Sequence, residues 1–416
     1  MSKTTATAAR PVTIVTATIN QLARLTKPQR QFISALLLTL LALRGRVNFR
    51  HLARYGAYAE RTYGRQFQRS FPWVEFQRRL LTQAIAPAHE VIAGQDASFI
   101  PKSGKQTYGL DRFWNGCVSR AARGLEISTL AVVDVTQKAA YALAVAQTPP
   151  TPELTKMQAD ATRVDVAVQQ VVQQRAHLPA GVRYCVVDGW YAKLKYVDGV
   201  TASGLQVITK LRCDANMRFR YTGPRTGKRG RPKQFDGKVN WQDLTRFDYL
   251  GTAADAAHLH LYTAELYHIS LKRWLRVLVV VNRAPADKPR YIVLATTDLA
   301  LNPADILRYY QARFQIEFLF RDAKQHAGLS DCQARSQAAL DFHFNAALAA
   351  VNVTRATAVA AQPTDAPFVF SLATAKQCAF NEQFLAEIST QYGYDLSTWI
   401  NHPAYERLRT YGALAA

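Results

Sequence analysis

Cysteine is scarce in this sequence and never closely spaced. The 416 residues contain five cysteines, and no two of them form a C-x-x-C pair: Cys117, Cys185, Cys213, Cys332 and Cys378. Zinc knuckles and disulfide frameworks need closely spaced or paired cysteines. Neither is indicated here, and an odd number of unpaired thiols is typical of a protein kept in a reducing cytosol.

Long hydrophobic runs are also missing. The longest, Phe32 to Leu43, is interrupted by two polar residues and is followed by three arginines within seven positions. A membrane-spanning helix needs about 20 apolar residues, and a signal peptide has a cleavage site after its apolar run. We therefore predict a buried helix and no membrane partner. The sequence also lacks G-x-x-x-x-G-K-[ST], so no nucleotide cofactor is expected.

Acidic residues are few, and the excess of basic residues is concentrated. Against 52 Lys and Arg there are 30 Asp and Glu, which gives a net charge of +22. Residues 1–80 carry +12 of this charge, and residues 210–240 carry +8. Two separate basic segments predict two surfaces that contact a polyanion. With 49% hydrophobic residues, the chain is also rich enough in apolar side chains to form globular domains.

The first basic segment has a helical pattern. Pro28 suits the first turn of a helix that Gly45 ends, and a further helix is expected over residues 57–71. In that stretch Arg61, Arg65 and Arg69 are spaced by four, which places them on one helix face. A solvated surface would give the same pattern, but acids are almost absent here. We therefore predict a helical DNA-binding domain over residues 1–86.

The rest of the chain predicts a mixed α/β fold. Strand patterns at residues 91–100, 125–135 and 139–146 precede a helical stretch and two short buried strands at residues 182–188 and 205–211. Residues 214–299 are again rich in strands. A long helix is expected from Asn302 to Gly328, and another from Asp341 to Ala358. The predicted order is a first core segment (87–213), a β-rich insertion (214–299), a second core segment (300–345) and a helical C-terminal region (346–416).

Three carboxylates have positions that favour catalysis. Asp96 follows the small and apolar run VIAGQ, and Asp188 ends the buried-strand pattern RYCVVD. Each could separately be a turn or capping residue. Two acids at strand ends of one sheet need a compensating cation, which a divalent metal would supply.

The third carboxylate, Glu317, has distinctive partners on its predicted helix. Arg313, Glu317 and Lys324 lie three, seven and fourteen residues after Tyr310. At about 100° per residue these side chains share a sector of roughly 60°. A simple Arg313–Glu317 ion pair would contribute only about 0.3 kcal/mol. The many apolar neighbours on this helix predict that it is buried, so that Glu317 requires a partner such as a metal ion.

The spacing Y-x2-R-x3-E-x6-K resembles the signature of the DDE transposases of bacterial insertion sequences, in the insertion sequence four group. Supporting motifs are DASFIPKSGKQTYGLD around Asp96, VVDGWYAK around Asp188, ITKLRCDA after it, GKRGRPK at residues 227–233 and YYQARFQIEFLFRDAKQHAGL around Glu317. The resemblance extends from about Phe49 to Asn345. It implies an RNase H-like catalytic core with a β-rich insertion before the third acid.

The resemblance also implies the chemistry and the partners. Asp96, Asp188 and Glu317 would hold two divalent metal ions, normally Mg²⁺ with Mn²⁺ able to substitute, for cleavage and strand transfer of DNA. Tyr310, Arg313 and Lys324 would hold phosphates of the cleaved strand. Terminal inverted repeats and target DNA are the expected partners of a cytoplasmic, nucleoid-associated bacterial enzyme that forms a homodimer on paired ends. The segment with Lys228, Arg229, Arg231 and Lys233 would follow a phosphate backbone.

Several alternatives stay open at this point. Asp134 is another strand-end acid, for which a turn role is favoured, and His258 with His260 forms an H-x-H pair that lacks a third ligand. Any stacking of a flipped base, a property of some relatives, has three candidates in Trp241, Trp274 and Tyr291, and Trp190 has no assigned role. A DNA nuclease without strand transfer and a catalytically silent DNA-binding relative are the rival functions.

Overall fold

The structure, a computed structural model, describes residues 10–224, 232–284, 290–362, 368–400 and 402–414. Its N-terminal part is helical, with α1 (Pro11–Asn20), α2 (Lys27–Ala42), α3 (Phe49–Tyr55), α4 (Glu60–Gln66) and α5 (Trp73–Ala84). The predicted start of α2 is confirmed, because Thr26 and Gln29 form a reciprocal cap there and Pro28 lies in the first turn. The buried helix predicted from the longest apolar run is α2.

The predicted stripe of three arginines is only partly helical. Helix α4 ends at Gln66, so Arg61 and Arg65 lie on the helix and Arg69 lies in the turn after it. The helix ends there because Phe67 turns into the core, with its ring centroid 4.9 Å from that of Phe49 and 4.5 Å from that of Phe342. The prediction of one helix over residues 57–71 was therefore wrong. All three arginines are exposed.

The core sheet has the strand order β4-β3-β1-β5-β6, built from β1 (Val91–Pro101), β3 (Arg120–Asp134), β4 (Ala139–Gln147), β5 (Tyr184–Val187) and β6 (Gln206–Leu211). Strands β4, β3 and β1 are antiparallel, while β1, β5 and β6 are parallel. The short strand β2 (Asp111–Asn115) pairs with the beginning of β3. This mixed sheet is consistent with the predicted RNase H-like core.

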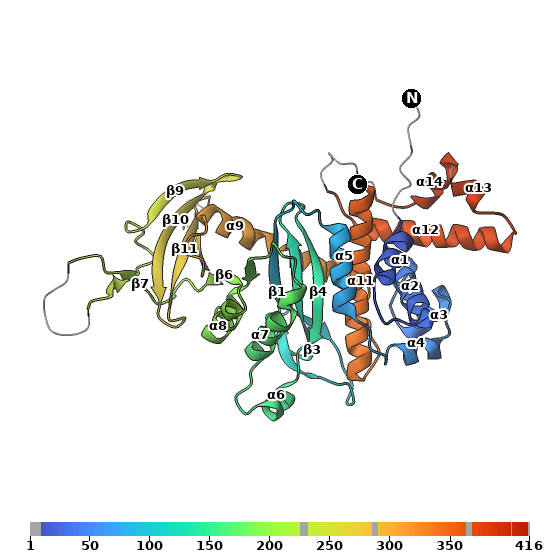
Figure 1. The fold of residues 1–416 in the computed structure, drawn as a ribbon, viewed down its shortest axis with the longest axis horizontal. Helices are drawn as coiled ribbons and strands as arrows, with labels where there is room; N and C mark the ends of the chain where they lie inside the picture. Colours follow the sequence, from blue (N-terminus) through green and yellow to red (C-terminus); the bar gives the residue numbers. More distant parts are fainter. Residues whose placement is uncertain (1–9, 225–231, 285–289, 363–367, 401, 415–416) are drawn as a thin grey trace.

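Helices cover both faces of the core sheet. On one face lies α7 (Arg163–Gln174), to which Gln95 of β1 is bonded through Ala167 O and Gln170 Oε1. The remaining elements on this side are α6 (Thr151–Met157), the 3-10 turns η1 (Arg175–His177) and η2 (Gly189–Tyr191), and α8 (Leu194–Ala202). On the other face, α5 and α11 (Gln337–Ala361) pack beside β4 (Figure 1). The helical stretch predicted after residue 154 is thus interrupted before Arg163.

The β-rich segment extends the same sheet. Its strands are β7 (Met217–Arg220), β8 (Phe235–Lys238), β9 (Asp248–Ala253), β10 (Ala256–His268), β11 (Arg273–Asn282) and β12 (Arg290–Thr296). Strand β12 pairs antiparallel with β6 of the core, so core and inserted strands form one twelve-stranded sheet. Figure 1 shows these strands at the end of the molecule away from the N-terminal helices.

Two helices replace the single helix predicted over residues 302–328. They are α9 (Pro303–Ala312) and α10 (Gln315–His326), with a turn at Arg313–Phe314 between them. The predicted cap is confirmed, because Asn302 Oδ1 accepts a hydrogen bond from Ala304 N at 3.0 Å. After the long buried α11, the chain ends in α12 (Leu372–Gln391), α13 (Ser397–Ile400) and α14 (Pro403–Arg409). No helix in the described ranges is long and apolar enough to span a membrane.

Candidate active site

Asp96 and Asp188 lie at the same edge of the core sheet. Strands β1 and β5 are parallel neighbours, with Gly94 of β1 opposite Val186 of β5. Two residues further along each strand, this register places Asp96 level with Asp188. The four residues of β5 are all buried, and Asp188 begins the exit turn by accepting a hydrogen bond from Trp190 N at 2.9 Å. Two carboxylates are thus delivered to one place by adjacent strands.

Glu317 reaches the same edge because α10 packs closely on β1. A Cβ atom at Gly94 would lie only 2.4 Å from Ile316 Cδ1, so the glycine makes room for the first turn of α10. Gly94 and Asp96 are two residues apart and therefore point to the same face of the strand. Ile316 is fully buried, and Glu317 is the next residue. The close contact of Gly94 with Ile316 fixes the helix that carries the third acid.

The turn between α9 and α10 places Arg313 between two carboxylates. Its Nη1 lies 3.2 Å from Asp96 Oδ2, and its Nη2 lies 3.0 Å from Glu317 Oε1. The turn is tight because Phe314 N, Ile316 N and Glu317 N each bond to a carbonyl three residues earlier rather than four. The expectation of a continuous helix failed at this point, but Arg313 and Glu317 still lie together.

The electrostatics of the site centre on Asp96. Burial raises the pKa of Asp96 to about 7, with Arg313 opposing the shift and the charges of Asp188 and Glu317 adding to it. The three carboxylates therefore share one electrostatic environment. The Asp96 side chain is 18% exposed and that of Glu317 is 44% exposed, so the site opens toward solvent on the side of Glu317.

Of the other two residues of the helical signature, Tyr310 lies near this group and Lys324 lies further along α10. The Arg313 guanidinium is 5.5 Å from the centre of the Tyr310 ring. Burial raises the pKa of Tyr310, and the electrostatic influences on it include Asp188 and Glu317 as well as Arg313. Lys324 is half-buried further along α10, and burial lowers its pKa. Arg313 Nε is buried without a hydrogen-bond partner.

The three acids have the side-chain chemistry that divalent cations bind. Carboxylate oxygens are the ligands that Mg²⁺ and Mn²⁺ prefer, and among the described residues Asp96 and Glu317 share one ion-pair partner, Arg313. In the part of the chain that the structure describes, however, no three His, Cys, Asp or Glu side chains are close enough together to hold one ion. A metal ion held by all three acids would therefore require their carboxylates to come closer together than they lie here.

The predicted outer DNA contacts lie elsewhere. Lys228, Arg229 and Arg231 are outside the described residues. Lys233 is described, and its ammonium lies 3.3 Å from Asp236 Oδ1 and 4.3 Å from the centre of the Tyr221 ring. The structure therefore does not bring Lys233, or the three N-terminal arginines, into the group around Asp96.

The competing motifs have structural explanations. Asp134 is fully buried, lies 2.6 Å from His89 Nδ1 and accepts a hydrogen bond from Gln137 N, which agrees with the favoured turn role. His260 Nδ1 is hydrogen-bonded to the Tyr249 hydroxyl at 2.8 Å. Two of the three aromatic residues considered for stacking on a flipped base make hydrogen bonds within the protein: the Trp241 indole donates to Ala215 O, and the Tyr291 hydroxyl donates to Cys213 O.

Trp190 is a residue near the site that sequence reasoning left without a role. Its side chain is 46% exposed directly beside Asp188, and Lys193 Nζ lies 3.6 Å from the centre of its ring. Gly94 was missed altogether. Its only sequence signal was a glycine inside a strand pattern, which is typical of a close backbone approach.

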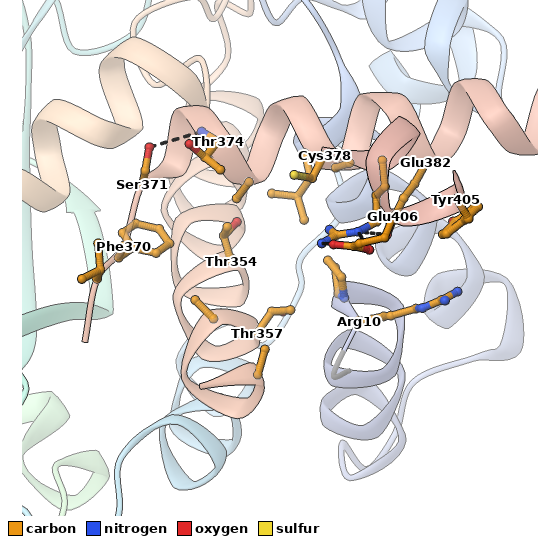
Figure 2. A pocket seen from close by; sticks show the side chains of 18 of the residues that line it. Arg10, Thr354, Thr357, Phe370, Ser371, Thr374, Cys378, Glu382, Tyr405 and Glu406 are labelled. Atoms are coloured by element: carbon orange, nitrogen blue, oxygen red, sulfur yellow. Dashed lines mark hydrogen bonds and ion pairs between the residues drawn. The ribbon is translucent and has the colours of Figure 1, made fainter. Parts of the chain in front are cut away.

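A cavity of about 580 Å³ lies away from the carboxylates, between α11, α12 and α14 (Figure 2). Three of the charged groups that line it are paired, with Arg409 Nη2 2.6 Å from Glu406 Oε1 and Arg409 Nε 3.8 Å from Glu382 Oε1. None of the three candidate acids lines it. The proposed chemistry thus belongs to an open sheet edge rather than to an enclosed pocket.

Comparison of the sequence with known protein families gives a match, which covers the two strands that carry Asp96 and Asp188. Residues 21–260 match the family model described as DDE superfamily endonuclease. The chain belongs to this superfamily. Membership implies a DNA substrate and the use of divalent metal ions, which such nucleases require. The matched range includes Asp96 and Asp188 and ends before Glu317. A search of curated proteins gave no match.

Proposed function

We propose that this DDE endonuclease is a transposase of the insertion sequence four group. It would bind the terminal inverted repeats of its element and catalyse DNA cleavage and strand transfer. The observation that carries the proposal is the meeting of distant segments: Arg313 and Glu317 of the Y-x2-R-x3-E-x6-K signature lie against Asp96 on β1, beside the strand that ends at Asp188.

The proposed roles of the acids follow from their positions. Asp96, which is more buried than Glu317 and shares Arg313 with it, would bridge two metal ions, and Asp188 and Glu317 would each complete one. The ions are proposed to be Mg²⁺, with Mn²⁺ able to substitute. When bound, such ions activate the attacking oxygen and stabilise the leaving 3′ oxygen of the phosphodiester. The chain itself contributes the rigid strand edge that holds the carboxylates.

The proposed DNA contacts surround these acids. Tyr310, Arg313 and Lys324 would hold phosphates of the cleaved strand: Arg313 and Tyr310 lie beside the acids, Lys324 lies further along the helix that carries Glu317, and two of the three are cationic. Residues 1–86 would recognise the element's ends through Arg61, Arg65 and Arg69, with residues 346–416 as a separate helical region. Residues 214–299 would contribute the basic loop with Lys228, Arg229, Arg231 and Lys233. A homodimer would hold two ends together.

A joining assay tests the proposal. The chain is incubated with a terminal-repeat fragment, a target plasmid and Mg²⁺. Joined products support a transposase. Hydrolysis without joining supports instead a DNA nuclease on the same core, and absence of cleavage with retained binding supports a catalytically silent relative.

Single substitutions test the three acids. Asp96→Asn, Asp188→Asn and Glu317→Gln should each abolish cleavage and leave DNA binding within about twofold of the original chain. Asp255→Asn changes an exposed acid of the β-rich segment and serves as the matched control, which should cleave normally. Retained cleavage in any one of the three variants would remove that residue from the proposed triad.

A further inference from the structure

Strand β2 and the beginning of β3 form a two-stranded ribbon that extends past the catalytic strand. Arg112 of β2 lies opposite Arg123 of β3, and Asn115 lies opposite Arg120. Strand β1 ends at Pro101, opposite Gly124. Residues 120–123 therefore have β2 as their only strand partner among the described residues, and the ribbon continues the sheet beyond the end of β1.

The base of the ribbon is firmly attached to the core. Phe113 is fully buried, and the Arg163 guanidinium of α7 lies 4.2 Å from the centre of its ring. Asp111 Oδ2 accepts hydrogen bonds from Thr151 N, Thr151 Oγ1 and Arg163 Nη2 at 2.7–3.1 Å. An isolated two-stranded hairpin is only marginally stable. These contacts hold the ribbon in a fixed direction.

One face of the ribbon is basic and aromatic. Arg112, Trp114 and Arg123 point to the same side. Arg112 and Trp114 are two residues apart on β2 and therefore share a face, and Arg123 is directly opposite Arg112. All three are exposed, Trp114 to 61%. The residue opposite Trp114 is Ala121, too small to cover an indole ring. We call Arg112, Trp114 and Arg123 the ribbon face.

The ribbon face has unbalanced charge. Two arginines directly opposite each other repel, which costs stability unless an anion lies between them. Within the described ranges no carboxylate forms an ion pair with either Arg112 or Arg123, and Arg112 Nη2 instead donates to Ala121 O at 3.2 Å. An arrangement of exposed arginines around an exposed indole suits the phosphates and sugars of nucleic acid.

The ribbon face is continuous with the catalytic face of the sheet. Asp96 is opposite Thr129 of β3, and Thr129 and Arg123 are separated by an even number of residues, so both point to the same side. Burial lowers the pKa of Lys324 on α10, and the charge of Cys117, in the turn of the ribbon, opposes that shift. The two arginines of the ribbon face thus lie on the same side of the sheet as Asp96.

The register gives the distance along this path. From Thr129 to Arg123 the strand advances six residues, or about 20 Å at ~3.4 Å per residue. Duplex DNA advances ~3.4 Å per nucleotide of one strand. A strand whose phosphate lies at Asp96 and which runs along this face would therefore reach the ribbon after about six nucleotides.

We propose that the ribbon face is a DNA-binding arm that grips the substrate backbone about six nucleotides from the cleaved phosphodiester. This inference rests on the proposed function for the position of that phosphodiester. The two arginines would bind phosphates, and Trp114 would pack against the sugar or base edge between them.

The first experiment measures phosphate contacts without requiring cleavage. In an Asp96→Asn background, binding to a 30-base-pair duplex of mixed sequence is measured at several salt concentrations. Arg112→Gln with Arg123→Gln should weaken binding at least tenfold and lower the slope of log K against log salt by about 2, since each phosphate contact contributes about 0.9. The matched control is Arg183→Gln with Arg407→Gln, two exposed arginines elsewhere, which should leave the slope unchanged. Equal salt slopes for the Arg112/Arg123 and Arg183/Arg407 double variants would contradict the proposal that the ribbon face binds DNA.

The second experiment measures position. Cys117 and Cys213 are exposed and the other three cysteines are buried, so a Cys213→Ser chain can carry iron–EDTA on Cys117 alone. On the terminal-repeat fragment its cuts should centre about six nucleotides from the site that the unsubstituted chain cleaves. The Cys117→Ser chain, labelled at Cys213, should not cut there.

The outcomes separate the arm from the proposed function. If the unsubstituted chain cleaves the fragment but no Cys117 cuts lie within about ten nucleotides of the cleavage site, the arm is wrong. If the chain cleaves no fragment, the proposed function fails, while the salt dependence on the mixed-sequence duplex still decides whether the ribbon face binds DNA.

Discussion

Arg313 has two possible sets of partners, and this is the central feature of the site at the scale of single residues. In the structure it neutralises Asp96 and Glu317, and its Nε has no hydrogen-bond partner among the described residues. Two divalent ions at the same carboxylates would repel a guanidinium, which would then be released toward the phosphates it is proposed to hold. Metal binding and substrate binding would thus use the same side chain in succession.

The raised pKa of Asp96 predicts a pH dependence of metal binding. The pKa of about 7 lies above the ordinary value of 3.8, so protonation stabilises the folded protein, and this contribution is lost as pH rises from about 4 through about 7. A metal ion must displace that proton below pH 7. Isothermal titration should therefore give an apparent Mn²⁺ affinity about tenfold weaker at pH 6 than at pH 8.

A matched variant isolates the Asp96 proton. Asp255→Asn removes an exposed acid and should keep the tenfold difference, since Asp255 lies outside the site. Equal Mn²⁺ affinity at the two pH values would show that Asp96 is already ionised at pH 6 and would contradict the prediction.

Sequence reasoning named the acids at this scale but not the contacts that orient them. The spacing of Tyr310, Arg313, Glu317 and Lys324 predicted one helix face. It did not show that Arg313 reaches across to Asp96, because that contact joins residues 217 positions apart. The roles of the acids stay predictions. Asp134 illustrates the limit well: its strand pattern resembles that of Asp188, but its side chain is fully buried and paired with His89.

At the scale of elements, the packing of α10 on β1 determines where Glu317 lies. Gly94 allows Ile316 to approach the strand. Gly94→Ala should cost about 1–3 kcal/mol of stability through overpacking and strongly reduce cleavage, because the added Cβ displaces α10. Adding Ile316→Val removes the clashing Cδ1 and should restore most of the cleavage. Urea unfolding and the joining assay measure the two effects.

Gly181→Ala is the control for this pair. The nearest atom to its new Cβ would be Val91 Cγ2 at an ordinary 3.8 Å, so stability and cleavage should hardly change. If Gly94→Ala loses cleavage and the Ile316→Val addition does not improve it, the contact does not position Glu317.

A buried ion pair fixes the other side of α10. Asp322 Oδ2 lies 2.9 Å from Arg355 Nη2 of α11, and Arg355 also donates to Ala140 O of β4. Arg355→Met leaves a buried carboxylate and should cost about 3 kcal/mol, at the lower end of the usual range because Arg321 still bonds to Asp322. Asp322→Leu with Arg355→Met should recover part of that stability in urea unfolding. Arg321→Met, on the exposed side, should cost less than about 1 kcal/mol.

The errors of the sequence predictions at this scale have a common cause. At the break between α9 and α10, Arg313 and Phe314 keep helical backbone angles, with φ of −51° and −59°. No Gly or Pro marks the break in the sequence. The end of α4 depends on Phe67 entering a core made partly by α11. Periodicity describes local preference, whereas both endings depend on partners distant in sequence.

At the scale of the whole molecule, the positive charge lies at the two ends of a nearly neutral middle. The described part of the N-terminal segment, residues 10–80 with +11, lies beside the C-terminal helices (Figure 1). The described parts of the second segment, residues 210–224 and 232–240, carry six Lys or Arg against two Asp, or +4, and lie on and around β7 and β8. That the two segments are separate DNA contacts stays a prediction.

The N-terminal arginines can be tested independently of the metal site. Arg61→Gln with Arg65→Gln should weaken binding to a terminal-repeat duplex and lower the salt slope by about 2, with Mn²⁺ affinity unchanged. Arg69→Gln alone tests the arginine that lies outside α4. An unchanged salt slope in the double variant would assign these side chains to a solvated surface.

The pairing of β12 with β6 has a further consequence for how this enzyme could evolve or be shortened. Removing residues 214–299 would leave β6 with an open edge of unsatisfied backbone donors and acceptors, which is a template for self-association. In the full chain β12 pairs with that edge, so we expect a chain without residues 214–299 to self-associate where the full chain does not. Strand β12 is followed by α9, which begins at Pro303, so these strands are joined in sequence to the helix pair that carries Glu317.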